Sequence, residues 1–136
     1  MSSSHFITLL HLSDLRFGRY HRFGRLALAS PEDSLDAVLG RLGDDLRKLR
    51  EEHDLRPDLL ILTGDLTQSG LRSEFQDALR LIEGITDLLR LPRNQVGIVP
   101  GNHDVNRKAC QAYFMECEAD EQKPVPPYWP KWRHYV

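Results

Sequence analysis

Short apolar runs alternate along the chain with longer stretches in which apolar and polar residues mix. Three nearly continuous apolar runs, at residues 6–12, 59–63 and 96–100, are typical of buried strands that are covered on both faces. The stretches between them carry apolar residues at helical spacing. This order predicts an α/β fold with a parallel β-α-β-α-β core and right-handed connections.

The two stretches between the predicted strands have the signals of helix starts and stops. The first helix is expected to begin at residues 30–33, where a capping Ser is followed by Pro and two acidic residues. The second is expected to begin near Ser73, with Gln76 three residues later as in a capping box. Pro92 ends the second helix, because the residue before a proline disfavours helical geometry.

The C-terminal third combines one more predicted helix with a change of composition. A helix is expected after Asp104, with Cys110 and Cys117 on one face as core thiols. From residue 123 onward, four prolines and four aromatic residues exclude a regular helix. We therefore divide the chain into a domain of residues 1–122 and a tail or linker of residues 123–136.

Composition and charge exclude several classes of protein. The 136 residues correspond to one domain, and 18 basic against 20 acidic residues leave a net charge of −2. That balance argues against attraction to nucleic acid by bulk charge. The apolar runs fall short of the ~20 residues that a membrane span needs. Two cysteines are too few for a disulfide scaffold, and without a secretory signal we expect a cytoplasmic protein.

Each predicted strand runs into a polar cluster at its carboxyl end. Because these ends meet at one edge of a parallel sheet, Asp14, Asp65, Asn102 and His103 should converge there. Oxygen-rich sets of this kind suit divalent ions such as Mn²⁺, Fe²⁺ or Mg²⁺. A pair of such ions stabilises the attacking and leaving oxygens of phosphoryl transfer. The alternative is that each carboxylate is only a turn residue or a cap, with Asp104 capping the next helix.

The three clusters resemble the signature of the calcineurin-like metallophosphoesterases. Residues 12–15, 64–67 and 101–104 match its first three blocks, and the whole match covers residues 6 to 107. The stretch from residue 64 to 104 is most similar to the cyclic-nucleotide phosphodiesterase branch. The resemblance implies the first half of an αββα sandwich and hydrolysis of a phosphodiester or phosphomonoester, with a cyclic nucleotide as one candidate substrate.

The resemblance also implies a role for each matching residue. Asp14 would ligate the first of two divalent ions (Mn, Fe, Zn or Mg), Asp65 would bridge both ions, and Asn102 would ligate the second. His103 would stabilise or protonate the departing oxygen, and Asp104 would orient His103. A metal-activated water would attack the phosphorus in line with the leaving group.

The first departure from the family's pattern is Arg16, which stands where the signature has a histidine. A guanidinium stays protonated and has no lone pair for a metal. Its charge is expected either to take part of the first metal's space or to hold a phosphate oxygen, which makes Arg16 a candidate substrate-binding residue. His11 lies within a strand and is not an obvious replacement. His21, in the segment that follows the first cluster, could swing in as a ligand, the alternative being a solvated loop histidine.

The second departure is that the later histidine motifs of the family are absent. After His103 the only histidine is His134, in the tail. The chain therefore resembles the N-terminal half of the domain, and we expect further domains or a partner to complete it. One alternative is a catalytically degenerate binding or regulatory module of a larger signalling protein. Another is binding of single-stranded nucleic acid by the aromatic and basic tail, and a third is that the tail packs on the domain or continues into the next strand.

Overall fold

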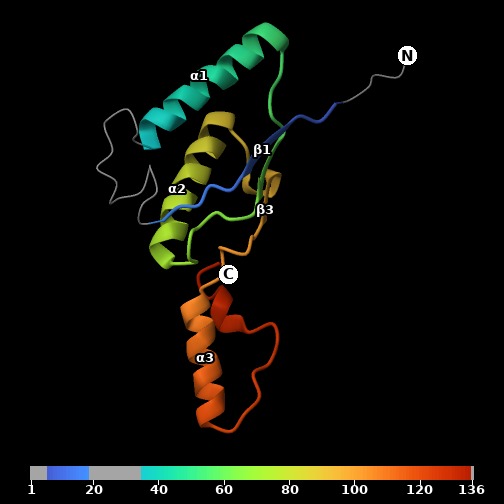
Figure 1. Cartoon of the computed structure of the whole chain (residues 1–136). Coiled ribbons are helices and arrows are strands. Elements are labelled where there is room, and N and C mark those ends of the chain that lie inside the picture. Colours follow the sequence, from blue (N-terminus) through green and yellow to red (C-terminus); the bar gives the residue numbers. More distant parts are fainter. Residues whose placement is uncertain (1–5, 19–34, 136) are drawn as a thin grey trace.

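The computed structural model describes residues 6–18 and 35–135, and Figure 1 shows their arrangement. Strands and helices alternate along the described chain, as the sequence predicts. The elements are, in order, β1 (Leu9–Ser13), α1 (Leu35–His53), β2 (Leu59–Thr63), α2 (Arg72–Leu89), the 3₁₀ turn η2 (Arg93–Gln95), β3 (Val96–Val99), α3 (Arg107–Ala119) and the 3₁₀ turn η3 (Trp129–Trp132).

The three strands form one sheet in the order β1-β2-β3, and both pairings are parallel. This confirms the predicted α/β fold. Strand β2 has the predicted bounds. Strand β1 begins three residues later than expected, and the exposed Phe6 and Ile7 precede it. Strand β3 ends before Pro100, which has no N–H to donate to a neighbouring strand.

The hydrophobic core lies between one face of the sheet and the helices α1 and α2. Leu60 and Leu62 of β2 are fully buried, and Ile82 and Ile85 of α2 pack in the same cluster. Side chains that alternate to the opposite face remain accessible. The prediction that every strand is covered on both faces is therefore wrong for the described residues, because Leu9 is 55% exposed and Val99 is 56% exposed.

Helix α2 is capped differently from the prediction. It begins at Arg72, and the carboxylate of Glu74 accepts hydrogen bonds from the N–H groups of Ser69 at 2.9 Å and Leu71 at 3.1 Å. Glu74 therefore occupies the place in the capping box that we expected for Gln76. The helix ends at Leu89, before Pro92, as predicted. Helix α1 is described from Leu35, so its expected start at residues 30–33 lies outside the described residues.

Helix α3 and the tail that follows it pack against each other. Asn106 caps the helix, since its side-chain oxygen accepts from the N–H of Ala109 at 2.9 Å. The alternative that Asp104 is this cap is wrong. The tail turns back on α3, and the carbonyl of Lys131 accepts from the N–H of Asn106 at 2.7 Å. Of the two predicted core thiols, Cys117 is buried and Cys110 is half-buried.

Within residues 6–18 and 35–135, no helix has both the length and the apolar composition needed to cross a membrane.

Candidate functional site

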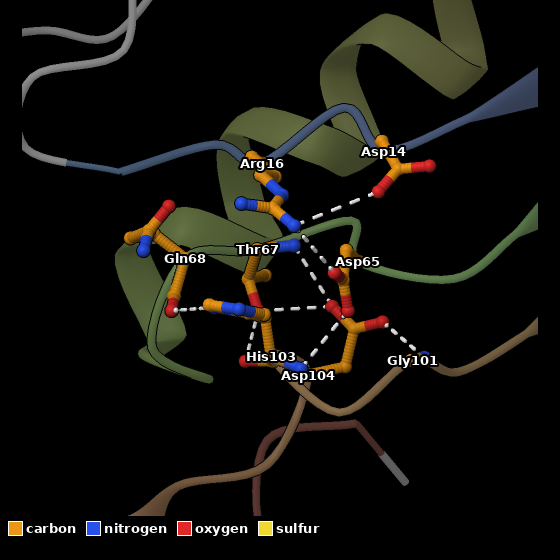
Figure 2. Close-up of polar contacts among 8 residues, drawn as sticks. All are labelled: Asp14, Arg16, Asp65, Thr67, Gln68, Gly101, His103 and Asp104. Atoms are coloured by element: carbon orange, nitrogen blue, oxygen red, sulfur yellow. Dashed lines mark hydrogen bonds and ion pairs between the residues drawn. The ribbon is translucent and has the colours of Figure 1, made fainter.

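The carboxyl ends of the three strands meet at one edge of the sheet, and the candidate residues follow directly from them (Figure 2). The backbone turns sharply at this point. Asp14, Arg16, Gly64 and Asp65 all have positive φ angles, between 46° and 69°. Left-handed conformations are unfavourable for residues other than glycine, and they cluster at functional sites. The loops are thus bent to aim their side chains over the sheet edge.

Asp104 joins the loops that follow β2 and β3. Its side chain is buried, with 1% of the residue exposed. One carboxylate oxygen accepts from the N–H of Thr67 at 2.8 Å and from its hydroxyl at 2.9 Å, and the other accepts from the N–H of Gly101 at 2.8 Å. A buried carboxylate is stable only when it is hydrogen-bonded in this way. We call the Asp104 carboxylate, the N–H and hydroxyl groups of Thr67 and the N–H of Gly101 the Asp104 network.

Gly101 lets the two loops approach closely. A Cβ atom at this position would overlap the backbone nitrogen and the Oδ1 atom of Asp65, and it would lie 2.9 Å from the Cα of Gly64. No side chain fits there without movement of the backbone. Glycine at this position therefore sets the position of Asp65.

Asp65 lies at the centre of the site. Its Oδ1 atom accepts a hydrogen bond from the N–H of His103 at 3.0 Å, and its Oδ2 atom accepts from Nη2 of Arg16 at 3.2 Å. Only 8% of the Asp65 side chain is exposed. Asp65 thus connects all three loops, and the metal-bridging role that we expect for it remains a prediction.

The imidazole of His103 is oriented by a main-chain group. Its Nδ1 lies 2.9 Å from the carbonyl oxygen of Gln68. A carbonyl can only accept, so Nδ1 carries the proton and Nε2 is left for another partner. We expected Asp104 to orient this ring, but both Asp104 oxygens are engaged in the Asp104 network. Asp104 is therefore a positioning residue for the loops, and the orienting contact belongs to Gln68.

A cavity of about 380 Å³ adjoins the ring of His103. It has basic side chains at the start of α3 and backbone from the loop after β2. Its lining residues are Gln68, Ser69, Leu71, His103, Val105, Asn106, Arg107 and Lys108.

Arg16 lies between two carboxylates. Its Nη2 atom is 3.2 Å from Asp65 Oδ2 and 3.7 Å from Asp14 Oδ1. The side chain of Arg16 is 48% exposed and that of Asp14 is 63% exposed. Both alternatives for Arg16 remain predictions: that the guanidinium takes space that a metal would need, and that it holds a phosphate oxygen.

The remaining candidates are less closely connected to this centre. Asn102 is exposed, and among the described residues its side chain makes no hydrogen bond. His11 is bonded to the hydroxyl of Thr63 at 2.7 Å, on the neighbouring strand. His134 lines a separate cavity with Tyr135 against α2. His21 lies outside the described residues.

Tyr135, in the tail, is a titratable group whose pKa is shifted by its surroundings. Its hydroxyl lies 3.5 Å from the carbonyl oxygen of Ile98. Burial raises the pKa of Tyr135, and the negative charge of Asp104 raises it further. The Asp104 network therefore acts electrostatically on the tail as well as on the two loops.

The described residues do not fit the two divalent ions that the resemblance implies. No group of three or more His, Cys, Asp or Glu side chains arranged to hold a metal occurs in residues 6–18 and 35–135. Oxygens of Asp14 and Asp65 face a guanidinium, and the second oxygen of Asp65 accepts from a backbone N–H. Two ions would need more donors than Asp14, Asp65 and Asn102 supply.

Comparisons with known proteins identify the family of the chain. A family model described as calcineurin-like phosphoesterase matches residues 7–135, including most of the tail. An uncharacterized metallophosphoesterase-like protein of Bacillus subtilis, YydB, is 31% identical over 110 residues. That alignment covers 81% of this chain and 20% of YydB, so the chain spans about a fifth of the length of this relative. On this evidence, the chain belongs to the calcineurin-like phosphoesterase family.

Proposed function

We propose that this chain carries the Asp65–His103 part of the active site of a phosphoester hydrolase. The observation that supports this most directly is the hydrogen bond of 3.0 Å between the N–H of His103 and the carboxylate of Asp65. It brings together the two residues to which the family resemblance gives the central roles. They belong to different loops that a buried network holds in place.

In this proposal His103 acts in its doubly protonated form: the proton on Nε2 passes to the departing oxygen of the ester, and the proton on Nδ1 stays in the hydrogen bond to the carbonyl of Gln68. The carbonyl of Gln68 fixes the ring through Nδ1, so Nε2 is the atom that faces the substrate. The cavity beside the ring would receive part of the substrate, and Arg107 and Lys108 at its wall favour a substrate that carries negative charge. A phosphodiester such as a cyclic nucleotide or a phosphomonoester would satisfy these conditions.

We further propose that the active site is completed by donors from outside the described residues. The donor set of Asp14, Asp65 and Asn102 is too small for two ions, and the chain spans a fifth of the relative that it matches. A further domain, a second half of the fold or a partner would supply the missing groups. Catalysis depends on placement, and a misplacement of about 1 Å can cost ~10²-fold in rate. Residues 1–136 alone should therefore be a poor catalyst.

The test is release of p-nitrophenol from bis(p-nitrophenyl) phosphate by residues 1–136 in the presence of Mn²⁺. We expect little turnover, and any turnover should fall at least about tenfold in Asp65→Asn and in His103→Gln. His134→Gln is the matched control, because this histidine lies outside the site.

Three other outcomes have distinct meanings. Fast turnover that Asp65→Asn abolishes would show that the site is complete in this chain. Fast turnover that survives Asp65→Asn would overturn the proposed mechanism. No turnover together with no bound metal would favour a binding or regulatory module.

A further inference from the structure

The guanidinium of Arg16 provides a positive charge where two carboxylates meet. A single nitrogen, Nη2, lies 3.2 Å from an oxygen of Asp65 and 3.7 Å from an oxygen of Asp14 (Figure 2). The Asp65 side chain is only 8% exposed, so its charge has lost most of its contact with water. A buried carboxylate needs a compensating cation or several hydrogen bonds. Arg16 is that cation in this structure.

The main chain of Arg16 is held independently of its side chain. The N–H of Arg16 donates to the carbonyl of Asp65, and the N–H of Phe17 donates to the carbonyl of Leu66, both at 2.8 Å. Phe17 is buried in the core and pairs with Thr67 in an isolated parallel bridge. The loop after β1 therefore runs alongside the loop after β2. This geometry places the base of the Arg16 side chain within reach of both carboxylates.

A divalent ion that joined the same two carboxylates would compete with the guanidinium. Such ions bind carboxylate oxygens at about 2.0–2.6 Å, which places them between the two groups. A guanidinium cannot be neutralised by losing a proton. The two cations would repel each other strongly at such short separations.

We infer that Arg16 is a built-in cation that replaces one of the two metal ions at this site, so that the chain binds at most one divalent ion there. The inference rests on the family membership and on the ion-pair geometry, and it does not require that the chain hydrolyses anything. The half-exposed guanidinium keeps further N–H donors for a phosphate oxygen, so the positive charge of the lost ion remains available to a substrate.

The experiment combines metal counting with thermal unfolding on the whole 136-residue chain. Calorimetric titration with MnCl₂ gives the number of bound ions. Circular dichroism gives the Tm in EDTA and in excess Mn²⁺. The variants are Arg16→Met, which removes the charge, and Arg16→Lys, which keeps a charge. Arg47→Met is the matched control, because Arg47 forms an ion pair with Asp44 on the surface of α1.

For the unaltered chain we expect at most one Mn²⁺ and a smaller rise in Tm from EDTA to excess Mn²⁺ than for Arg16→Met. Arg16→Met should lose roughly 4 °C in EDTA, because Asp65 is left without its cation, and Mn²⁺ should restore the loss. It should also bind Mn²⁺ at least about tenfold more tightly than the unaltered chain, or bind one Mn²⁺ where the unaltered chain binds none. Arg16→Lys should stay closer to the unaltered chain than Arg16→Met, and Arg47→Met should match the unaltered chain.

Two Mn²⁺ bound tightly by the unaltered chain would overturn the inference, and this measurement needs no variant to fold. The inference also fails if Arg16→Met binds Mn²⁺ as the unaltered chain does, or if its lost Tm does not return with Mn²⁺. None of these measurements uses turnover. A chain that hydrolyses phosphoesters with two bound Mn²⁺ would therefore refute the built-in cation while supporting the proposed function.

Discussion

The loops after β2 and β3 are joined by a buried side chain, whereas the loop after β1 is joined to the loop after β2 by main-chain hydrogen bonds and a half-exposed cation. Asp104, in the loop after β3, is 1% exposed and accepts from two groups of Thr67 in the loop after β2 and from the N–H of Gly101 in its own loop. The Asp14 side chain is 63% exposed and has the Arg16 guanidinium at 3.7 Å. The segments that match the family's second and third blocks are thus rigidly connected. The loop after β1 departs from the family's pattern at Arg16, where a permanently charged guanidinium stands in place of a histidine.

The largest expected effect is the loss of the Asp104 network. Asp104→Ala leaves the N–H groups of Thr67 and Gly101 unsatisfied, and we expect a loss of about 3–4 kcal/mol in the free energy of unfolding. Asp14→Ala should cost less than about 1 kcal/mol, because its ion pair is exposed. Urea denaturation followed by circular dichroism measures both. Equal losses for the two variants would contradict the contrast between the loops.

The close approach of the same two loops can be tested at Gly101. Gly101→Ala forces a Cβ against the backbone of Gly64 and Asp65, and we expect a loss of about 2–3 kcal/mol. Gly40 in α1 is the matched control, because a Cβ there meets nothing within 4 Å. Gly40→Ala should stabilise the chain by about 0.5–1 kcal/mol, since alanine favours a helix. Urea denaturation measures the change in the free energy of unfolding for each variant. If Gly101→Ala stabilised the chain as Gly40→Ala does, the two loops would not be as tightly packed as described.

The loop after β1 can be tested by replacing Arg16 with the histidine of the family's pattern. Arg16→His removes a repelling charge and adds a metal ligand, so the affinity for Mn²⁺ should rise by about 1–3 kcal/mol. Arg16→Leu separates the two causes, because it removes the charge without adding a ligand. Calorimetric titration with MnCl₂ measures the affinity. An unchanged affinity in Arg16→His would show that Arg16 does not oppose metal binding.

The smallest effect concerns the tail. The folded-state pKa of Tyr135 is raised, so its contribution to stability is complete below the ordinary value of 10.0. That contribution is lost as the pH rises through the folded-state pKa. Tyr135→Phe should remove this alkaline loss, and the difference should be small because solvent screens a partly exposed group. Ultraviolet titration of tyrosinate in the unaltered chain and in Asp104→Asn checks the cause. A Tyr135 pKa that does not fall in Asp104→Asn would exclude the electrostatic contribution.

The strand order and the parallel pairing could be predicted because apolar runs and turn residues are local signals. The contacts that orient the side chains of the site could not be predicted from such local signals. The partner of His103 is the carbonyl of Gln68, and a main-chain group leaves no mark on residue type. The contacts of Asp104 were not predicted either, because its carboxylate reaches back to Gly101 and across to Thr67. Only the packing of two loops decides this.

For Arg16 as well, the sequence predicts the chemistry of the residue but not its contacts. Its presence at a position where the family has histidine is visible in the sequence, and its inability to bind a metal follows from its chemistry. The direction in which the guanidinium points depends on the positive φ of Arg16 and on the hydrogen bond from its N–H to Asp65. Those are properties of the folded loop and not of the residue type.

The claim that this sheet edge is the phosphoester site has a direct test that does not depend on turnover. Residues 1–136 labelled with ¹⁵N would be titrated with inorganic phosphate in the presence of Mg²⁺, and the backbone amide signals followed by NMR. The account predicts that the largest shifts occur at the amides of residues 14–17, 65–68 and 101–104. Shifts confined to the basic and aromatic tail at residues 128–135, with none at the sheet edge, would contradict it.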